Sequence, residues 1–224
     1  MIFHMIDTET TGLQPDPDAH VVEIAVVTYH LNNGVIAQFS SLVQPPVLTE
    51  RGAEVMARCS KIEPAALVHA PSPGEVWGVV CSQLASYPAR VSAWNLPFDR
   101  HMIRRTFLGL DDRPQILAQH DLPPEALGQK YGWPEDAPML ADPTPWGACA
   151  MRAFSRHYAH ESHGRYGDIY AGSWAPKPWT LARAAERSQV AFQGQHHRAL
   201  ADATVAAELY ARTLLGVPLP PEGE

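Results

Sequence analysis

Two carboxylates, Asp7 and Glu9, stand one residue apart at the end of the apolar run that begins the chain. In a β-strand, residues i and i+2 point to the same face, so both side chains are expected to emerge side by side, with Ile6 and Thr8 on the other face. Adjacent carboxylates repel each other unless one takes a proton or a cation lies between them, and hard divalent cations such as Mg²⁺ or Mn²⁺ prefer carboxylate oxygens. The pair alone is also compatible with a solvated strand end. Only further candidate ligands along the chain can distinguish a metal site from that alternative.

Three more residues could take part in the same chemistry. Asp99 follows a short strand predicted over residues 89–94 and lies near the start of a helix that ends at Leu108, where the helix dipole alone also favours an acidic residue. A helix turns about 100° per residue, so a helical spacing of five residues would separate His197 from Asp202 by about 140°. We therefore expect His197 in a loop and Asp202 in the first turn of the last helix, from where both can reach a centre at the end of the first strand.

The elements that must position these residues are predicted from local patterns. Residues 20–31 are rich in β-branched side chains and predict a second strand. Residues 35–43 predict a third strand that runs back beside it. The dipeptide Asn33-Gly34 between them favours a tight hairpin turn with positive φ at both central residues, which gives an antiparallel meander of three strands. Further helices are predicted over residues 47–58, 74–87, 180–187 and 200–215, and from Trp146 to about His160.

The segment from 111 to 179 is rich in proline and aromatic residues and is too long for a structureless loop, so we expect an inserted subdomain or flap. Its tryptophans could stack on bases but are expected rather to form a small core; they are Trp146, Trp174 and Trp179. Three histidines at three-residue spacing could bind zinc, but a solvated stretch is the favoured interpretation; they are His157, His160 and His163.

Composition narrows the class of protein. A chain of 224 residues is expected to form one domain, residues 1–216, followed by a flexible tail, 217–224. The net charge of -7 argues against a non-specific nucleic-acid coat protein but not against a nuclease, whose metal ions would neutralise clustered carboxylates. Three scattered cysteines predict reduced, mostly buried thiols. Without a long apolar run or a signal sequence, we predict a cytoplasmic protein with no membrane partner.

Taken together, these residues resemble the DEDDh branch of the DnaQ-like 3′-to-5′ exonucleases. Members of that family carry an Asp-x-Glu on the first strand, an Asn-x-x-Phe-Asp at the start of a middle helix and a His-x-Ala-x-x-Asp at the start of the last helix. The corresponding motifs here are Asp7-Thr-Glu9, Asn95-Leu-Pro-Phe-Asp99 and His197-Arg-Ala-Leu-Ala-Asp202. The resemblance covers residues 1–108 and 178–215. The chain departs from the family in two places. The spacer between residues 108 and 178 is longer than in compact members, and Trp94 stands before Asn95 where the family often has a histidine.

The resemblance implies an α/β fold of the ribonuclease H-like type, with a mixed five-stranded sheet, its first three strands antiparallel, flanked by helices. It also implies two divalent cations, Mg²⁺ or Mn²⁺, held by Asp7, Glu9, Asp99 and Asp202. His197 would be the general base that takes the proton of the attacking water.

By the same resemblance, a pocket for the terminal nucleotide would be lined by Thr10, Thr11, Leu13, Asn95 and Phe98, although Leu13 and Phe98 could equally be core residues. Arginines are candidates for phosphate contacts because guanidinium groups match phosphate geometry; they are Arg198, Arg104 and Arg105.

The implied activity is release of nucleoside 5′-monophosphates from a 3′ end, with single-stranded or proofread DNA favoured over RNA, and the partners would be that 3′ end and either a homodimer or a polymerase. Two alternatives stay open, a non-catalytic polymerase-associated interaction module and a two-metal hydrolase of small nucleotides.

Overall fold

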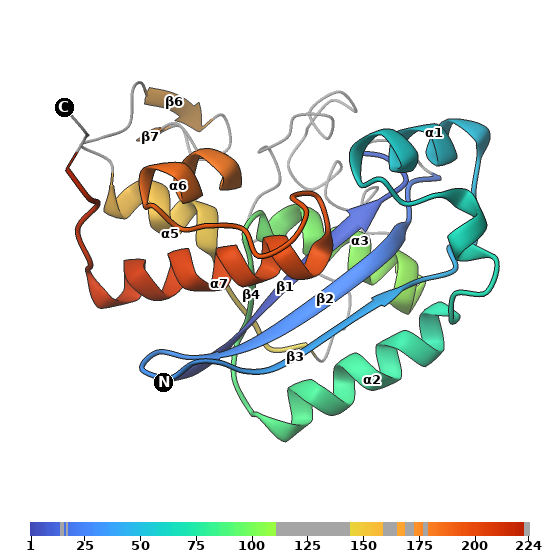
Figure 1. Cartoon of the computed structure of the whole chain (residues 1–224), viewed down its shortest axis with the longest axis horizontal. Coiled ribbons are helices and arrows are strands. Elements are labelled where there is room, and N and C mark those ends of the chain that lie inside the picture. The colour runs from blue at the N-terminus through green and yellow to red at the C-terminus, as the bar shows by residue number, and fades with distance from the viewer. Residues whose placement is uncertain are drawn as a thin grey trace.

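The first strand lies at the centre of a mixed sheet in the computed structural model, which describes residues 1–13, 16, 18–110, 144–158, 165–168, 173–176 and 179–221. The sheet has five strands in the order β3-β2-β1-β4-β5 (Figure 1). Their bounds are β1 Ile2–Thr10, β2 Val21–His30, β3 Gly34–Leu42, β4 Val91–Ala93 and β5 Trp146–Cys149. β1, β2 and β3 pair antiparallel, whereas β4 and β5 run parallel to β1. The predicted fold class is confirmed.

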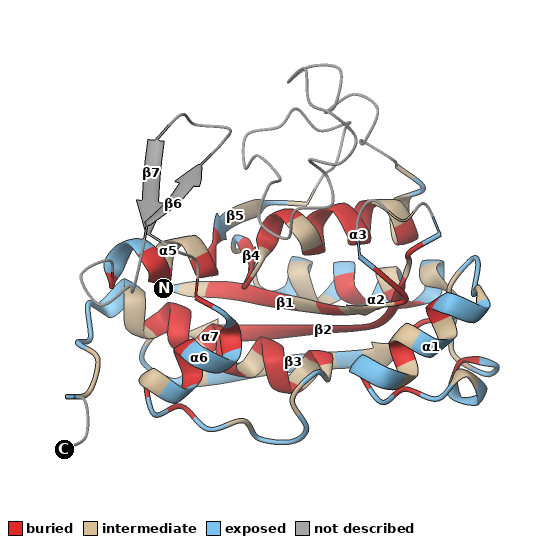
Figure 2. Ribbon diagram, turned by 90° about the horizontal axis from the view of Figure 1, so that it is seen from above, coloured by how far each residue is buried: buried red, intermediate tan, exposed pale blue. Residues whose placement is uncertain are grey.

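Helices cover both faces of this sheet (Figures 1 and 2). Phe3 of β1 packs edge-on against Tyr210 of α7 (Ala199–Leu215), so α7 lies on the face of the odd-numbered β1 residues. On the opposite face, His4 contacts the carbonyl of Tyr87, which directly follows α2 (Pro73–Ser86). The remaining α-helices are α1 Glu50–Cys59, α3 Leu96–Leu108, α5 Ala150–His157 and α6 Leu181–Arg187, with a short 3₁₀ turn at Pro64–Leu67.

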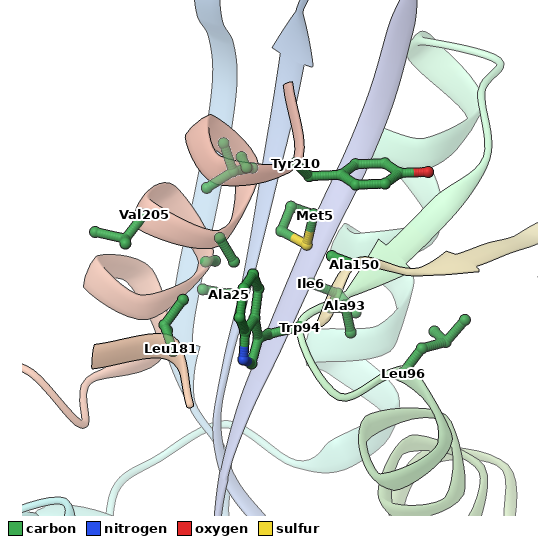
Figure 3. Close-up of a cluster of buried hydrophobic side chains, with 14 of the residues drawn as sticks. Met5, Ile6, Ala25, Ala93, Trp94, Leu96, Ala150, Leu181, Val205 and Tyr210 are labelled. Atoms are coloured by element: carbon green, nitrogen blue, oxygen red, sulfur yellow. The ribbon is translucent and has the colours of Figure 1, made fainter. Parts of the chain in front are cut away.

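The core explains why β1 carries so few polar residues before its end. Met5 and Ile6 are fully buried on opposite faces of the strand, as expected for a strand between two helical layers. Trp94 lies among the buried side chains that join β1 to α6 and α7 (Figure 3), and its Nε1 donates to the Trp179 carbonyl at 3.3 Å. Trp179 is itself buried and packs edge-on against Phe154 of α5. This tryptophan therefore belongs to the main core, whereas the side chain of Trp174 lies outside the described residues.

The hairpin between β2 and β3 differs from the predicted two-residue turn. Gly34 has positive φ (75°), but Asn33 does not, and Asn33 donates its N–H to the His30 carbonyl at 3.0 Å. His30 pairs with Gly34 across the hairpin, so the loop consists of the three residues 31–33. Gly34, which directly follows the loop, has the left-handed backbone that this kind of hairpin requires. The prediction located the hairpin correctly but assigned the wrong turn type.

The prediction that a helix starts at Trp146 is also wrong. Residues Trp146–Cys149 form β5, which pairs parallel to β4, and the helix begins at Ala150. A Cβ on Gly147 would lie 2.9 Å from the Ser92 Oγ, so this glycine lets the two strands approach closely. Residues 144–158 thus belong to the main sheet and its helical cover, while 111–143 lie outside the described residues.

The cysteines and the C-terminal tail were also predicted from the sequence. Cys59 and Cys81 are exposed, so the prediction of mostly buried thiols is wrong for both, while Cys149 is buried. Beyond α7, the Pro220 carbonyl accepts a hydrogen bond from Arg187, and Leu219 packs partly buried against the core. Residues 222–224 lie outside the described residues, and the domain boundaries as a whole stay predictions.

Candidate active site

The carboxylates of Asp7, Glu9 and Asp202 meet at the carboxyl end of β1. One oxygen from each lies within 4.8 Å of the others. Asp7 and Glu9 project from β1 toward the face covered by α7, and Asp202 comes from the first turn of that helix. Side-chain alternation along β1 and the position of Asp202 near a helix start therefore bring these three residues together as predicted.

Asp99 reaches the same end of β1 from the opposite face of the sheet. It lies in the first turn of α3, is 3% exposed, and accepts a hydrogen bond from the Thr8 Oγ1 at 2.8 Å. Thr8 points away from Asp7 and Glu9, so β1 supplies acids on one face and a support for Asp99 on the other. Asp99 lines the same cavity as the other three carboxylates. The sequence pattern did not single out Thr8 for this contact.

A second support reaches Glu9 from α1. The Ser60 Oγ, in the C-cap residue directly after α1, donates a hydrogen bond to the Glu9 Oε2, and Ser60 is 1% exposed. The α1 backbone lies close to the strand end, since a Cβ on Gly52 would be 3.0 Å from the Thr11 Cβ. This close approach fixes α1 where its C-cap residue can hold Glu9. Nothing in the local sequence pattern signals Ser60.

Burial and mutual repulsion raise the pKa values of all four carboxyl groups. The pKa of Asp7 lies well above its usual range, first because the group is buried and then because Asp99, Asp202 and Glu9 are close. Burial likewise raises the pKa of Glu9, Asp99 and Asp202 to about 7 each. Hydrogen bonds from Ser60 and Thr8 partly offset these shifts at Glu9 and Asp99. Without a cation, these acids therefore keep their protons up to a much higher pH than ordinary carboxyl groups do.

His197 lies in the loop before α7, as predicted, with the backbone in the left-handed region (φ 63°). Its N–H donates to the Asp202 Oδ1 at 3.3 Å, and its ring is exposed at the cavity. His196 was not predicted, yet its Nε2 lies 3.7 Å from the Asp202 Oδ2, and the two imidazole rings are 3.9 Å apart. The loop therefore presents two histidines beside Asp202.

These groups line a cavity of about 1070 Å³. The predicted pocket residues Thr10, Thr11, Leu13, Asn95 and Phe98 all line it. Leu13 is 63% exposed, so it is no core residue, while Phe98 also packs against the core. The cavity thus gathers all five predicted pocket residues but not Arg198, a candidate for a phosphate contact.

Arg198 instead pairs with Glu23, which is on β2. The other two candidate arginines do not line the cavity either. Arg104 is fully buried, and Arg105 donates to the Asp16 carbonyl at 2.8 Å. The structure therefore gives no support to phosphate contacts by these three arginines.

Two walls of the cavity have different chemistry. One is apolar and comprises Trp94, Phe98, Met151, Trp179 and Leu181. The other is the face of α1 that carries Arg51, Val55 and Arg58, with both arginines exposed. Their i, i+4, i+7 spacing marks one side of a helix and could have been found in the sequence, because this helix was predicted.

The donor set fits a hard divalent cation. Asp7, Glu9 and Asp202 offer oxygen ligands only, and Asp99 lies close enough to Asp7 to raise its pKa. A second group, His196, His197 and Asp202, also has ligand atoms within 4.8 Å of one another. Of the three histidines considered for zinc, His160 and His163 lie outside the described residues.

Comparison with known proteins gives one family match. Residues 5–110 match the family model described as "Exonuclease" (RNase_T). Comparison with curated proteins finds no match. None of the described helices is both long and apolar enough to cross a membrane.

Three solved structures share the fold. The nuclease domain of 3'hExo, "a DEDDh family member, bound to rAMP", is 13% identical (TM-score 0.60), and the alignment covers 96% of this chain and 92% of that one. A full-length 3'-exonuclease is 14% identical (TM-score 0.59; 96% and 60% covered). E. coli Exonuclease I in complex with a dT13 oligonucleotide is 15% identical (TM-score 0.59; 96% and 41% covered). The chain thus spans less than two thirds of the last two proteins. These likenesses confirm the expected fold, and the family match covers the first two of the three motifs.

Proposed function

We propose that this protein, which has the fold of the DEDDh exonucleases and matches the exonuclease family over residues 5–110, removes nucleoside 5′-monophosphates from the 3′ end of a nucleic acid. The observation that carries the proposal is the convergence of Asp7, Glu9 and Asp202 within 4.8 Å, beside Asp99, in one open cavity. Four carboxylates that repel one another in the absence of a cation are an arrangement suited to metal-dependent phosphodiester hydrolysis.

The four carboxylates would hold two divalent cations, Mg²⁺ or Mn²⁺, which supply charge stabilisation and an activated water. Asp7, central to the cluster and most strongly affected by its neighbours, is the best candidate to contact both ions. Thr8 and Ser60 keep Asp99 and Glu9 in fixed orientations, so these acids need little rearrangement on binding.

His197 is the proposed general base. Its ring is exposed on the loop before α7, where a small movement can bring it to a water held beside the carboxylates. His196 is closer to Asp202 in this structure and is the competing candidate. The motif His-x-Ala-x-x-Asp favours His197, because only that histidine has the five-residue spacing to Asp202.

The two walls of the cavity suggest how a nucleic-acid strand binds in it. The apolar wall, which includes Phe98 and Trp179, suits the terminal base and sugar. Arg51 and Arg58 on α1 suit the phosphates of the preceding nucleotides, and no ion pair of either is found among the described residues. Asp16 and Asp18 also border the cavity and would repel a phosphate backbone, which leaves the α1 side as the favoured path.

Single-stranded DNA is the proposed substrate, with RNA as the competing class, since the similar structures include one with a dT13 oligonucleotide and one bound to rAMP. A cytoplasmic location and an association as a homodimer or with a polymerase remain predictions.

The test is a time course with 5′-labelled single-stranded DNA and RNA oligomers of one sequence, in Mg²⁺, Mn²⁺ or EDTA. The wild-type protein should shorten the oligomers one nucleotide at a time from the 3′ end, with metal only. Asp7→Asn should be inactive and Glu54→Gln, on the exposed side of α1, fully active. Metal-independent cleavage, or full activity of Asp7→Asn, would contradict the proposal. Hydrolysis of mononucleotides without any shortening of oligomers would favour the small-nucleotide hydrolase.

A further inference from the structure

Glu23 is a buried carboxylate beside the cluster that neither the carboxylate motifs nor the cavity lining includes. It lies on β2 directly opposite Glu9 of β1 and is 5% exposed. Residues opposite each other in an antiparallel pair point to the same face, so Glu23 faces α7, like Glu9. Two carboxylates in such positions repel each other, and a buried one requires partners.

Those partners all come from the start of α7. The Arg198 Nη2 donates to the Glu23 Oε1 at 2.7 Å, and the Arg198 Nε lies 3.0 Å from the Oε2. The Ala199 N–H donates to the Oε2 at 3.0 Å. Glu23 therefore receives a two-pronged guanidinium contact and a main-chain N–H from consecutive residues.

This contact substitutes for a missing helix cap. Arg198 is the N-cap residue of α7, but its own side chain makes no capping hydrogen bond. The first N–H groups of a helix need acceptors, and a carboxylate there also interacts favourably with the helix dipole. Glu23 supplies that acceptor from a neighbouring strand and so fixes where α7 begins.

The residue held by this arrangement is His197. Its backbone has φ 63°, a left-handed conformation that a residue with a Cβ adopts only when its surroundings impose it. Asp202 accepts the His197 N–H, and Glu23 holds the two residues that follow His197. The loop is thus fixed to the carboxylate cluster on one side and to β2 on the other.

We propose that Glu23 and Arg198 are positioning residues that hold His197 at the carboxylate cavity, an inference that rests on the proposed role of His197 as general base. Arg198 then acts on the loop through Glu23 and not on a phosphate of the substrate. The two roles differ in their kinetic effect. Loss of a phosphate contact weakens substrate binding, whereas misplacement of the base slows the chemical step.

The experiment compares Glu23→Gln, His197→Ala and the double variant at saturating Mn²⁺, with kcat and KM measured on one labelled oligomer. Glu23→Gln should lower kcat about 10- to 100-fold and leave KM within about twofold. In the His197→Ala background, the same change should have no further effect on kcat, because Glu23 acts through that histidine. Arg198→Lys, which keeps the charge but loses the planar two-pronged contact, should give the same pattern with a smaller decrease.

The matched control is Glu208→Gln. Glu208 also pairs with an arginine, Arg212, at 2.7 Å, but near the other end of α7. This variant should retain wild-type kcat, and the melting temperatures of both glutamate variants would show whether the fold is kept. If Glu23→Gln does not fold, Arg198→Lys carries the test.

Two results for Glu23→Gln would overturn the positioning role: an unchanged kcat, or a rise in KM alone. A third would be a double variant whose loss in kcat equals the product of the losses in the two single variants. A wild-type protein without exonuclease activity would instead refute the proposed function itself, and a fully active His197→Ala would refute the role of His197 as general base.

Discussion

Replacing Asp99 with asparagine should stabilise the metal-free protein at alkaline pH. Asp99 is 3% exposed, and its pKa is raised from 3.8 to about 7, chiefly by burial and also by repulsion from Glu9. Asparagine removes the charge but can still accept the hydrogen bond from Thr8 through its Oδ1. The variant therefore removes an unfavourable buried charge without opening a cavity or leaving the threonine without its partner.

The expected magnitude follows from the shift in pKa. A raised pKa in the folded state means that the folded protein binds the proton more tightly than the unfolded chain. The stability contributed by protonation is therefore complete below about pH 4 and is lost as the pH rises through about 7. At about 1.4 kcal/mol per pH unit, and with the coupling between the acids discounted, the charged Asp99 destabilises the fold by about 2 to 4 kcal/mol at pH 8.

Thermal unfolding in EDTA at pH 4.5 and pH 8 measures this effect. For a chain of this size, 2 to 4 kcal/mol corresponds to a rise in melting temperature of roughly 5 to 15 °C for Asp99→Asn at pH 8, with little change at pH 4.5. Adding Mg²⁺ or Mn²⁺ at pH 8 should stabilise the wild type and have much less effect on the variant, because one ligand is lost.

Glu54→Gln, a change at an exposed carboxylate of α1, should leave the melting temperature unchanged at both pH values. A variant that is less stable than the wild type at pH 8, or equally stabilised at both pH values, would refute the reasoning about a repulsive buried cluster.

Three further predictions concern activity. His197→Ala should lower kcat by at least about 100-fold and His196→Ala by less than about fivefold, as single-turnover cleavage with Mn²⁺ would measure. Changing both Arg51 and Arg58 to glutamine should raise KM about tenfold on a 12-nucleotide strand and leave a dinucleotide unaffected. The same change should reduce the slope of log affinity against log salt concentration by about 1.4, because two phosphate contacts are lost and each contributes about 0.7 on a single strand. Ser60→Ala should raise the metal concentration needed for half-maximal activity several-fold, because the hydrogen bond that lowers the pKa of the β1 glutamate is lost.

Each of these predictions has its own contradicting result. Equal losses for the two histidine variants would mean that the loop as a whole matters and not His197 alone. The arginine prediction is controlled by Arg156→Gln, an exposed arginine of α5 that does not line the cavity, and an identical salt slope for both proteins would argue against the α1 path. For Ser60→Ala, an unchanged metal titration would mean that Glu9 does not depend on Ser60 for its orientation.

Much of the fold could be predicted because its signals are local. The alternation of β1 places Asp7 and Glu9 on one face, and the Gly216 that ends α7 has the left-handed backbone that glycine favours. The errors occurred where local patterns are weak. Four residues beginning at Trp146 continue a helical pattern into Ala150, and only pairing with β4 makes them a strand.

The sequence by itself determined which acids and which histidine could form the site, because residue type, alternation and helix starts are properties of neighbours in the chain. The tertiary structure alone decided what holds them. Thr8 and Asp99 are 91 residues apart in sequence, Ser60 and Glu9 are 51 apart, and Arg198 and Glu23 are 175 apart. Such contacts depend on how helices pack on the two faces of the sheet, and no periodicity within either segment specifies its distant partner.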